Sequence, residues 1–321
     1  MTVRGKSVLV TGGAGFIGSH LVDRLVADGP RQLVVVDNFF LGNQENLRQA
    51  LQVRPDVEVI RLDASDLAAM QDIVVLHDVD VVFDLAVVPL PTSLAYPEWT
   101  VRTNVGIVLT FCELARRGAI ADLVHVSSSE AYGTARYVPM DEGHPHDAIT
   151  PYAASKSAAD HILESYVQTF GVVASTVRPF NNFGPRQNPG SYAGIIPIVV
   201  RRVMEGRPIE IHGDGEQTRD FLFVRETADM IVRVYENESC RGRVLNVASG
   251  HETTIKELVA RILRLMGRPD HEIFYTQARP GDVRRHCADV GLASSLIGLE
   301  PRGIRDEDLL ETIEWYRSLP Q

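Results

Sequence analysis

Residues 8–21 read VLVTGGAGFIGSHL, an apolar run followed by four glycines, three of which stand at intervals of three. Gly12, Gly15 and Gly18 stand between a strand-like segment and the start of an amphipathic segment. Glycines in this place allow a tight turn, close approach of backbone N–H groups to a pyrophosphate, and close helix–strand packing. The stretch predicts a dinucleotide-binding turn, although a plain strand–turn–helix connection would also fit it.

The chain downstream of this turn alternates short β-branched runs with longer amphipathic ones. Runs such as 33–38 (LVVVDN) are apolar on both faces, which is typical of parallel strands covered by helices. Pro151 opens a predicted helix that runs to Phe170, and a sixth parallel strand then ends at Pro179. We therefore predict an α/β fold with a Rossmann-type, doubly wound parallel sheet.

A second lobe is expected after this strand, because residues 181–194 are rich in Asn, Gly and Pro and the later spacing is less regular. Thr254, three residues before Glu257, predicts the N-cap of a helix that Gly267 ends. The predicted domains are an NAD-binding domain over 1–179, with return segments near 219–248, and a smaller mixed α/β substrate lobe formed mainly by 180–321.

The composition indicates which kinds of ligand the protein binds. The 321 residues carry a formal net charge of -10, which disfavours nucleic acid and anionic membranes and favours a small-molecule ligand. No apolar run approaches the ~20 residues of a membrane helix. The three cysteines have no CxxC or metal-ligand spacing, so we expect free thiols, no metal site and a cytoplasmic location.

Asp37 ends the second predicted strand, 19 residues after Gly18, where a carboxylate can accept hydrogen bonds from the adenosine ribose. An acid there repels a 2′-phosphate, so NAD is favoured over NADP. Asp63 is expected at the adenine, with the N-cap of the following helix as the alternative. The predicted cofactor site comprises Gly12, Gly15, Phe16, Ile17, Gly18, Asp37, Asn38, Asp63, Ala64, Leu85, Ala86, Asn104, Tyr152 and Lys156.

Tyr152 and Lys156 stand four apart on the predicted helix and so share one face. An ammonium near a phenol, together with a positively charged nicotinamide, favours the phenolate and lets the tyrosine act as a base. Such a pair is usually structural when it occurs alone. Its combination with the glycine-rich turn and the serine cluster at 127–129 favours catalysis.

Four motifs, TGGAGFIG (11–18), VSSSEAYG (126–133), PYAASK (151–156) and RPFNNFGPRQ (178–187), resemble those of the extended short-chain dehydrogenase/reductases that modify nucleotide sugars. The resemblance covers nearly the whole chain. It implies transient oxidation of a hexose at C4, in which Tyr152 takes the O4 proton, Lys156 holds the tyrosine and the nicotinamide ribose, and Ser128 hydrogen-bonds O4. It also implies a supporting role for Asn104, for which burial as a structural amide is the stronger interpretation.

The resemblance places the nucleotide diphosphate in the second lobe, where arginine suits phosphate because its planar fork bonds two oxygens. For Arg186, a salt bridge to a nearby acid is the alternative. The residues expected at the substrate are Ser93, Ser128, Asn181, Arg186, Arg219, Arg279 and Asp282.

Glu130 is the residue on which the expected reaction depends. Once C4 is a ketone, a carboxylate near C5 can start the elimination of water across C5 and C6. Typical dTDP-glucose 4,6-dehydratases carry Thr-Asp-Glu where this chain has Ser128, Ser129 and Glu130. The missing Asp leaves a separate acid in doubt. Residues 132–156 and 178–187 nevertheless resemble those of 4,6-dehydratases, so the resemblance favours dehydration. An exposed carboxylate facing solvent is the alternative for Glu130.

Three other activities remain open. UDP-glucuronate decarboxylation needs little beyond oxidation, but residues 86–97 lack the tyrosine that decarboxylases place near Ser93. Simple 4-epimerisation needs no Glu130. A catalytically silent NAD-binding sensor commonly loses the Tyr or the Lys, both of which are present here. The resemblance also implies a homodimer, formed through helices at 98–117 and 151–170.

Overall fold

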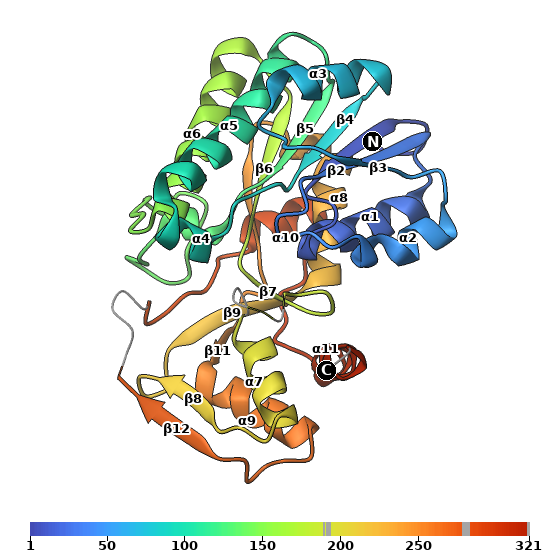
Figure 1. Ribbon diagram of the computed structural model, residues 1–321. Coiled ribbons are helices and arrows are strands. Elements are labelled where there is room, and N and C mark those ends of the chain that lie inside the picture. The colour runs from blue at the N-terminus through green and yellow to red at the C-terminus, as the bar shows by residue number, and fades with distance from the viewer. Residues whose placement is uncertain (189, 191–193, 278–282, 320–321) are drawn as a thin grey trace.

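A seven-stranded parallel sheet forms the larger part of the computed structural model, which describes residues 1–188, 190, 194–277 and 283–319 (Figure 1). Its strand order is β10-β6-β5-β4-β1-β2-β3. The strands are β1 (Ser7–Thr11), β2 (Gln32–Asp37), β3 (Glu58–Arg61), β4 (Val81–Asp84), β5 (Asp122–Val126), β6 (Ala174–Pro179) and β10 (Val244–Val247). The order reverses between β1 and β4, so the predicted doubly wound α/β fold is confirmed.

Helices cover both faces of this sheet, and the alternation of side chains along β1 shows why. Val8 and Val10 pack in one buried cluster with Leu21, whereas Leu9 packs in another with Phe111. Helices α1 (Phe16–Asp28), α2 (Arg48–Val53), α8 (Val224–Glu236) and α10 (Gly291–Ile297) contribute to the first cluster or border it. The opposite face is covered by α3 (Leu67–Leu76), α5 (Pro97–Arg116) and α6 (Pro151–Phe170), and α4 (Leu90–Ala95) packs against α5 and α6.

Helix α6 has the bounds that the sequence predicts. Pro151 occupies its first turn, and the Thr150 side chain accepts a hydrogen bond from the Ala153 N–H. Gly171 ends the helix in a left-handed conformation. Because β6 then ends at Pro179, the predicted helix and the predicted sixth strand are both confirmed. The seventh strand, β10, returns from the C-terminal half of the chain to pair with β6.

The smaller lobe lies beyond the carboxyl ends of the central strands (Figure 1). It contains two small sheets, β11-β9-β7 and β12-β8, around a third apolar cluster. Its elements are β7 (Asn181–Phe183), α7 (Ile195–Met204), β8 (Ile209–His212), β9 (Thr218–Phe223), β11 (Glu252–Thr254), α9 (Ile255–Leu265), β12 (Ile273–Thr276) and α11 (Asp306–Ser318). Thr254 caps α9 by accepting from the Glu257 N–H, and Gly267 follows its end with a φ of +69°, as predicted.

Short 3-10 turns complete the described chain at Gln44–Leu47, Ser129–Tyr132 and Glu238–Cys240. The thiols of Cys112, Cys240 and Cys287 are free and buried. Among the described helices, none combines the length and the apolar character that crossing a membrane requires. Within the same residues, His, Cys, Asp and Glu side chains do not gather in groups of three or more suited to a metal ion.

Candidate active site

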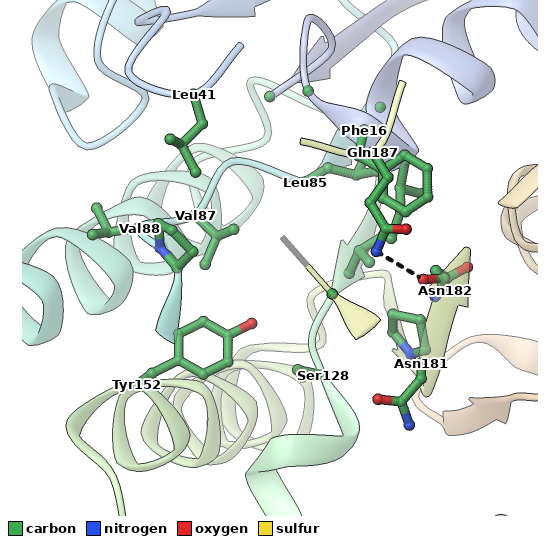
Figure 2. Close-up of a pocket in the computed structure, with 18 of the residues that line it drawn as sticks. Phe16, Leu41, Leu85, Val87, Val88, Ser128, Tyr152, Asn181, Asn182 and Gln187 are labelled. Carbon is green, nitrogen blue, oxygen red and sulfur yellow. Dashed lines mark hydrogen bonds between the residues drawn. The ribbon is translucent and has the colours of Figure 1, made fainter. Parts of the chain in front are cut away.

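A cavity of about 860 Å³ lies at the carboxyl ends of β1, β2, β4 and β5 and continues to the smaller lobe. In a doubly wound sheet this edge, next to the reversal of strand order, is where ligands bind. Figure 2 shows side chains from both lobes around the same space, among them Phe16 and Tyr152 from the larger lobe and Asn181 and Gln187 from the smaller one.

The glycine-rich turn forms one wall of the cavity and excludes any side chain at two positions. Gly12 has a φ of +63°, and a Cβ there would lie 2.9 Å from the backbone of Ala86. A Cβ at Gly18 would lie 2.1 Å from the Gly12 carbonyl oxygen. The backbone is therefore bare where a pyrophosphate needs to approach, and the turn fits a dinucleotide.

Asp37 lies beside this turn at the end of β2. Its carboxylate accepts hydrogen bonds from the backbone N–H groups of Ala14, at 3.0 Å, and Phe39, at 2.8 Å. Burial raises the pKa of Asp37, and these two bonds lower it. The carboxylate thus joins the phosphate turn to the loop after β2, and it lines the cavity where the adenosine ribose is expected.

The Asp63 side chain lines the cavity but does not cap the next helix. It accepts hydrogen bonds from the Ser65 N–H and hydroxyl, at 2.9 and 2.8 Å. Asp66 caps α3 instead, accepting from the Ala69 N–H at 3.1 Å. The N-cap alternative for Asp63 is therefore wrong, because the helix begins three residues later than that alternative requires.

Most of the other predicted cofactor residues also lie at the cavity. Lining it are Gly12, Gly15, Phe16, Ile17, Gly18, Asn38, Ala64, Leu85, Ala86, Tyr152 and Lys156. Asn104 is absent from this lining and only 3 % exposed. Its amide oxygen accepts from the Val88 N–H at 2.7 Å, and its amide nitrogen donates to the Val88 carbonyl and the Ser155 hydroxyl. Asn104 is thus placed as a structural amide that fixes the loop after β4 against α6.

Tyr152, Ser128 and Lys156 form the chemical centre of the cavity. The Tyr152 hydroxyl points into the open space, with Ser128 beside it (Figure 2). Burial raises the pKa of Tyr152 to about 12, and a side-chain hydrogen bond with Ser128 lowers it by less. The protein alone therefore keeps the phenol protonated near neutral pH. The positive charge of an oxidised nicotinamide would favour the phenolate.

Ser129 and Glu130 begin the 3-10 turn that follows β5. The Ser128 hydroxyl caps this turn by accepting from the Glu130 N–H at 3.2 Å. Ser129 is buried, and neither Ser129 nor Glu130 lines the cavity. Glu130 is half-buried, and burial raises its pKa while the charge of Arg219 lowers it. The solvent-exposed alternative for Glu130 is therefore wrong.

The residues predicted at the substrate divide into three groups. Asn181 and Arg219 line the cavity, as does Ser128. Ser93 and Arg186 do not line it. Ser93 is fully buried and donates to the Leu90 carbonyl at 2.7 Å, while Arg186 pairs with Asp23 of α1 at 2.7 Å. Arg279 and Asp282 lie outside the described residues.

Several lining residues were missed by the sequence analysis. Ser127 is 5 % exposed, lines the cavity, and has a hydroxyl without a hydrogen-bond partner among the described residues. Its place at the end of β5 was a usable signal for a ligand contact. The smaller lobe contributes polar side chains from separate elements, and for these the sequence spacing gave no signal. They are Asn182, Gln187, Arg202, Glu210, His212 and Gln217.

Comparisons with known proteins agree with this geometry. The family model described as "NAD dependent epimerase/dehydratase family" matches residues 8–248. A UDP-glucose 4-epimerase of Mycolicibacterium smegmatis is 35% identical over 98% of this chain and 99% of its own length. A dTDP-glucose 4,6-dehydratase of an Actinoplanes species is 32% identical over 97% of this chain and 98% of its own.

A solved structure has the same fold throughout. It is a UDP-N-acetylglucosamine 4-epimerase from Methanobrevibacter ruminantium M1 in complex with UDP-N-acetylmuramic acid, with 34% identity and a TM-score of 0.90. The match covers 98% of this chain and 99% of that one. The fold and the Ser–Tyr–Lys site define the class as NAD-binding short-chain dehydrogenase/reductases. Within it, the chain belongs to the NAD-dependent epimerase/dehydratase family, whose members are enzymes that use NAD.

Proposed function

We propose that the chain is an NDP-hexose 4,6-dehydratase. One observation carries the choice of reaction. Glu130, two residues after Ser128, is a half-buried carboxylate whose pKa is raised by burial and which interacts with the charge of Arg219. Oxidation and re-reduction at C4 do not require a carboxylate in this place. Removal of the proton from C5 requires one.

The first step uses the three residues at the chemical centre. Tyr152 takes the proton from O4, Ser128 holds O4 by a hydrogen bond, and Lys156 provides a buried positive charge. When bound, NAD would supply the hydride acceptor for C4 and the means of returning the hydride. Since the resting phenol has a pKa of about 12, the acceptance of a proton by Tyr152 depends on positive charge brought by the oxidised nicotinamide.

The second step uses Glu130. The ketone at C4 makes the C5 proton acidic, and Glu130 takes that proton and passes it to the C6 hydroxyl, which leaves as water. Return of the hydride to C6 and of a proton to C5 completes a 4-keto-6-deoxy sugar. The sum of these changes is the loss of one water, with NAD restored.

A 4-epimerase is the second candidate, and one observation favours it. Typical dehydratases have an acid where Ser129 stands, and neither Ser129 nor Glu130 lines the cavity. No side chain at this position can therefore protonate the leaving hydroxyl. If Glu130 cannot perform both proton transfers, the ketone returns to an alcohol with hydride on its other face.

Product masses test the proposal. Purified protein is incubated with UDP-, dTDP- and GDP-hexoses and with UDP-glucuronate. We expect a loss of 18 Da from a hexose for dehydration. A loss of 44 or 46 Da from the uronate indicates decarboxylation, and an unchanged mass with an altered sugar configuration indicates epimerisation. Either of the last two results rejects the dehydratase proposal.

We also propose a homodimer formed through α5 and α6. These two long helices lie side by side on one face of the sheet (Figure 1). They leave apolar side chains exposed at Val101 (37%), Leu109 (38%) and Phe170 (55%). Light scattering on a sized sample should give twice the 35.5 kDa of one chain. A Leu109→Glu variant should shift the mass toward the monomer, and a wild-type monomer would reject this arrangement.

A further inference from the structure

A chain of buried ionisable groups runs behind Lys156, away from the cavity. Asp84, His125, Lys156, Asp160 and Arg178 come from four different elements, and each is at most 4 % exposed. Two of these residues are aspartates, two are the basic residues Lys156 and Arg178, and the fifth is a histidine. Burial of so many ionisable groups is costly unless each is paired. Only Lys156 has a place in the proposed reaction.

The hydrogen bonds around His125 determine which of its ring nitrogens carries the proton. Nδ1 lies 2.8 Å from a carboxylate oxygen of Asp84, whose other oxygen accepts from the Thr11 hydroxyl at 2.7 Å. Nε2 lies 3.4 Å from the Lys156 Nζ. A carboxylate can only accept from Nδ1, and an ammonium can only donate to Nε2. Both contacts are satisfied when His125 is neutral, with its proton on Nδ1.

The Lys156 ammonium therefore has two hydrogen-bond acceptors within the protein. It donates to the Val126 carbonyl at 3.0 Å and to His125 Nε2. Both acceptors belong to β5, which ends at Val126, directly before Ser127 and Ser128. The position of the lysine charge is thus tied to the strand that carries the active-site hydroxyl.

Asp160 offers His125 an alternative partner. One of its carboxylate oxygens accepts from Arg178 at 2.7 Å. Its other oxygen is buried without a hydrogen-bond partner in the described part of the chain and lies 3.9 Å from His125 Nε2. A proton on Nε2 would face the Lys156 ammonium and favour this free oxygen instead. A proton on Nε2 would thus remove the acceptor that holds Lys156 in the structure.

We propose that His125, oriented by Asp84, is a positioning residue that holds the Lys156 ammonium in the active site through its neutral Nε2. This inference rests on the proposed C4 oxidation, in which Lys156 favours the Tyr152 phenolate. The charged groups that face His125 are Asp84 from β4, and Lys156 and Asp160 from α6, with Arg178 of β6 behind Asp160. Cys112 of α5 lies near Asp84, and burial raises the pKa of its thiol to about 12, so it stays neutral.

The tautomer of His125 can be measured without any activity. Long-range proton–nitrogen NMR correlations of the ten histidines, compared between wild type and His125→Gln, assign the His125 ring. We expect a proton on Nδ1 and a bare Nε2 at neutral pH. A proton on Nε2 at neutral pH would overturn the inference, whatever the substrate of the enzyme is.

Kinetics supply the second test. His125→Leu removes the acceptor and should lower kcat about 10–100-fold with little change in KM, because a misplaced catalytic group costs on this order. The acid limb of the kcat–pH profile should move to higher pH, since the phenolate loses a fixed neighbouring charge. His125→Gln, whose amide oxygen can accept from Lys156, should recover most of both effects.

His77→Leu is the matched control, because His77 is also buried and hydrogen-bonded, to Gln32 at 2.8 Å, but lies at the opposite ends of the strands. It should lower thermal stability without moving the pH profile. A His125→Leu enzyme with the wild-type acid limb would overturn the inference. If wild type turns over none of the sugars, the proposed function fails, and the tautomer measurement still decides the role of His125.

Discussion

The two walls of the cavity differ in how they are built. The wall on the larger lobe consists of strand ends and a glycine turn, where a Cβ would collide with backbone at Gly12 and Gly18. The wall on the smaller lobe consists of side chains such as Gln187, His212 and Arg219, from elements far apart in sequence. Backbone geometry thus defines the cofactor half, whereas individual side chains define the substrate half.

The largest effect on turnover is expected at Tyr152, where the two walls meet. Tyr152→Phe keeps the ring and removes the hydroxyl that takes the O4 proton, so kcat should fall by roughly 10²–10⁴-fold. Tyr166→Phe, on the same helix, removes a hydroxyl that bonds only Glu113 among the described residues and should leave kcat unchanged. Steady-state turnover measures both. A Tyr152→Phe enzyme with the wild-type rate would exclude the proposed chemistry.

Breaking the cofactor wall should give the next largest effect. Gly18→Ala places a Cβ 2.1 Å from the Gly12 oxygen, so the backbone has to shift. We expect a stability loss of about 1–3 kcal/mol from overpacking, and much weaker NAD binding by calorimetry. Gly303→Ala is the control, because nothing lies within 4 Å of the added carbon. Equal NAD affinity in the two variants would contradict a backbone-defined wall.

Arg219, which lines the wall on the smaller lobe, tests the substrate half of the cavity. Its positive charge lowers the pKa of Glu130 against the larger, opposite effect of burial. Arg219→Gln should therefore raise that pKa further and move the acid limb of dehydration to higher pH. KM should also rise about tenfold through the loss of the phosphate contact expected of Arg219. Arg219→Lys keeps the charge, so its acid limb should stay near that of wild type while KM increases. If the acid limb of Arg219→Gln stays at the wild-type pH, Glu130 is not the base of the reaction.

The smallest effect on catalysis is expected at Arg186, which joins the lobes without lining either wall. Its pair with Asp23 is largely buried, with side-chain exposures of 12% and 17%. Arg186→Ala should lower the free energy of unfolding by about 1–3 kcal/mol, because it leaves a buried acceptor unpaired. KM should not change. Arg102→Ala removes an exposed pair and should cost under about 0.5 kcal/mol. A raised KM in Arg186→Ala would restore the substrate role predicted from sequence.

The sequence predicted the cofactor wall well because its signals are local. The glycine spacing, the acid at the end of β2 and the Tyr–Lys pair on α6 all lie within single strand–turn–helix units. Ser93 and Arg186, also predicted at the substrate, do not line the cavity and instead bond the Leu90 carbonyl and Asp23. Spacing along the chain does not reveal such partners. The polar lining of the smaller lobe was missed for the same reason.

The Asp84–His125 pair shows this limit most clearly. The two residues are 41 positions apart and meet because β4 and β5 are neighbours in the sheet. The sequence predicted the class of sheet, doubly wound and parallel. It did not predict which side chains on neighbouring strands face each other. A buried pair of this kind becomes visible when the register of the two strands is known.

The central claim is that Glu130 removes a proton from C5 after C4 is oxidised. The most direct test runs wild type and Glu130→Gln in D₂O with the best NDP-hexose of the panel. We predict that the wild-type product loses water and carries one solvent deuterium on carbon, at C5. Glu130→Gln should still reduce its bound NAD but should form no dehydrated product. Dehydration with deuterium incorporation at the wild-type rate in Glu130→Gln, or an undeuterated wild-type product of unchanged mass, would contradict the account.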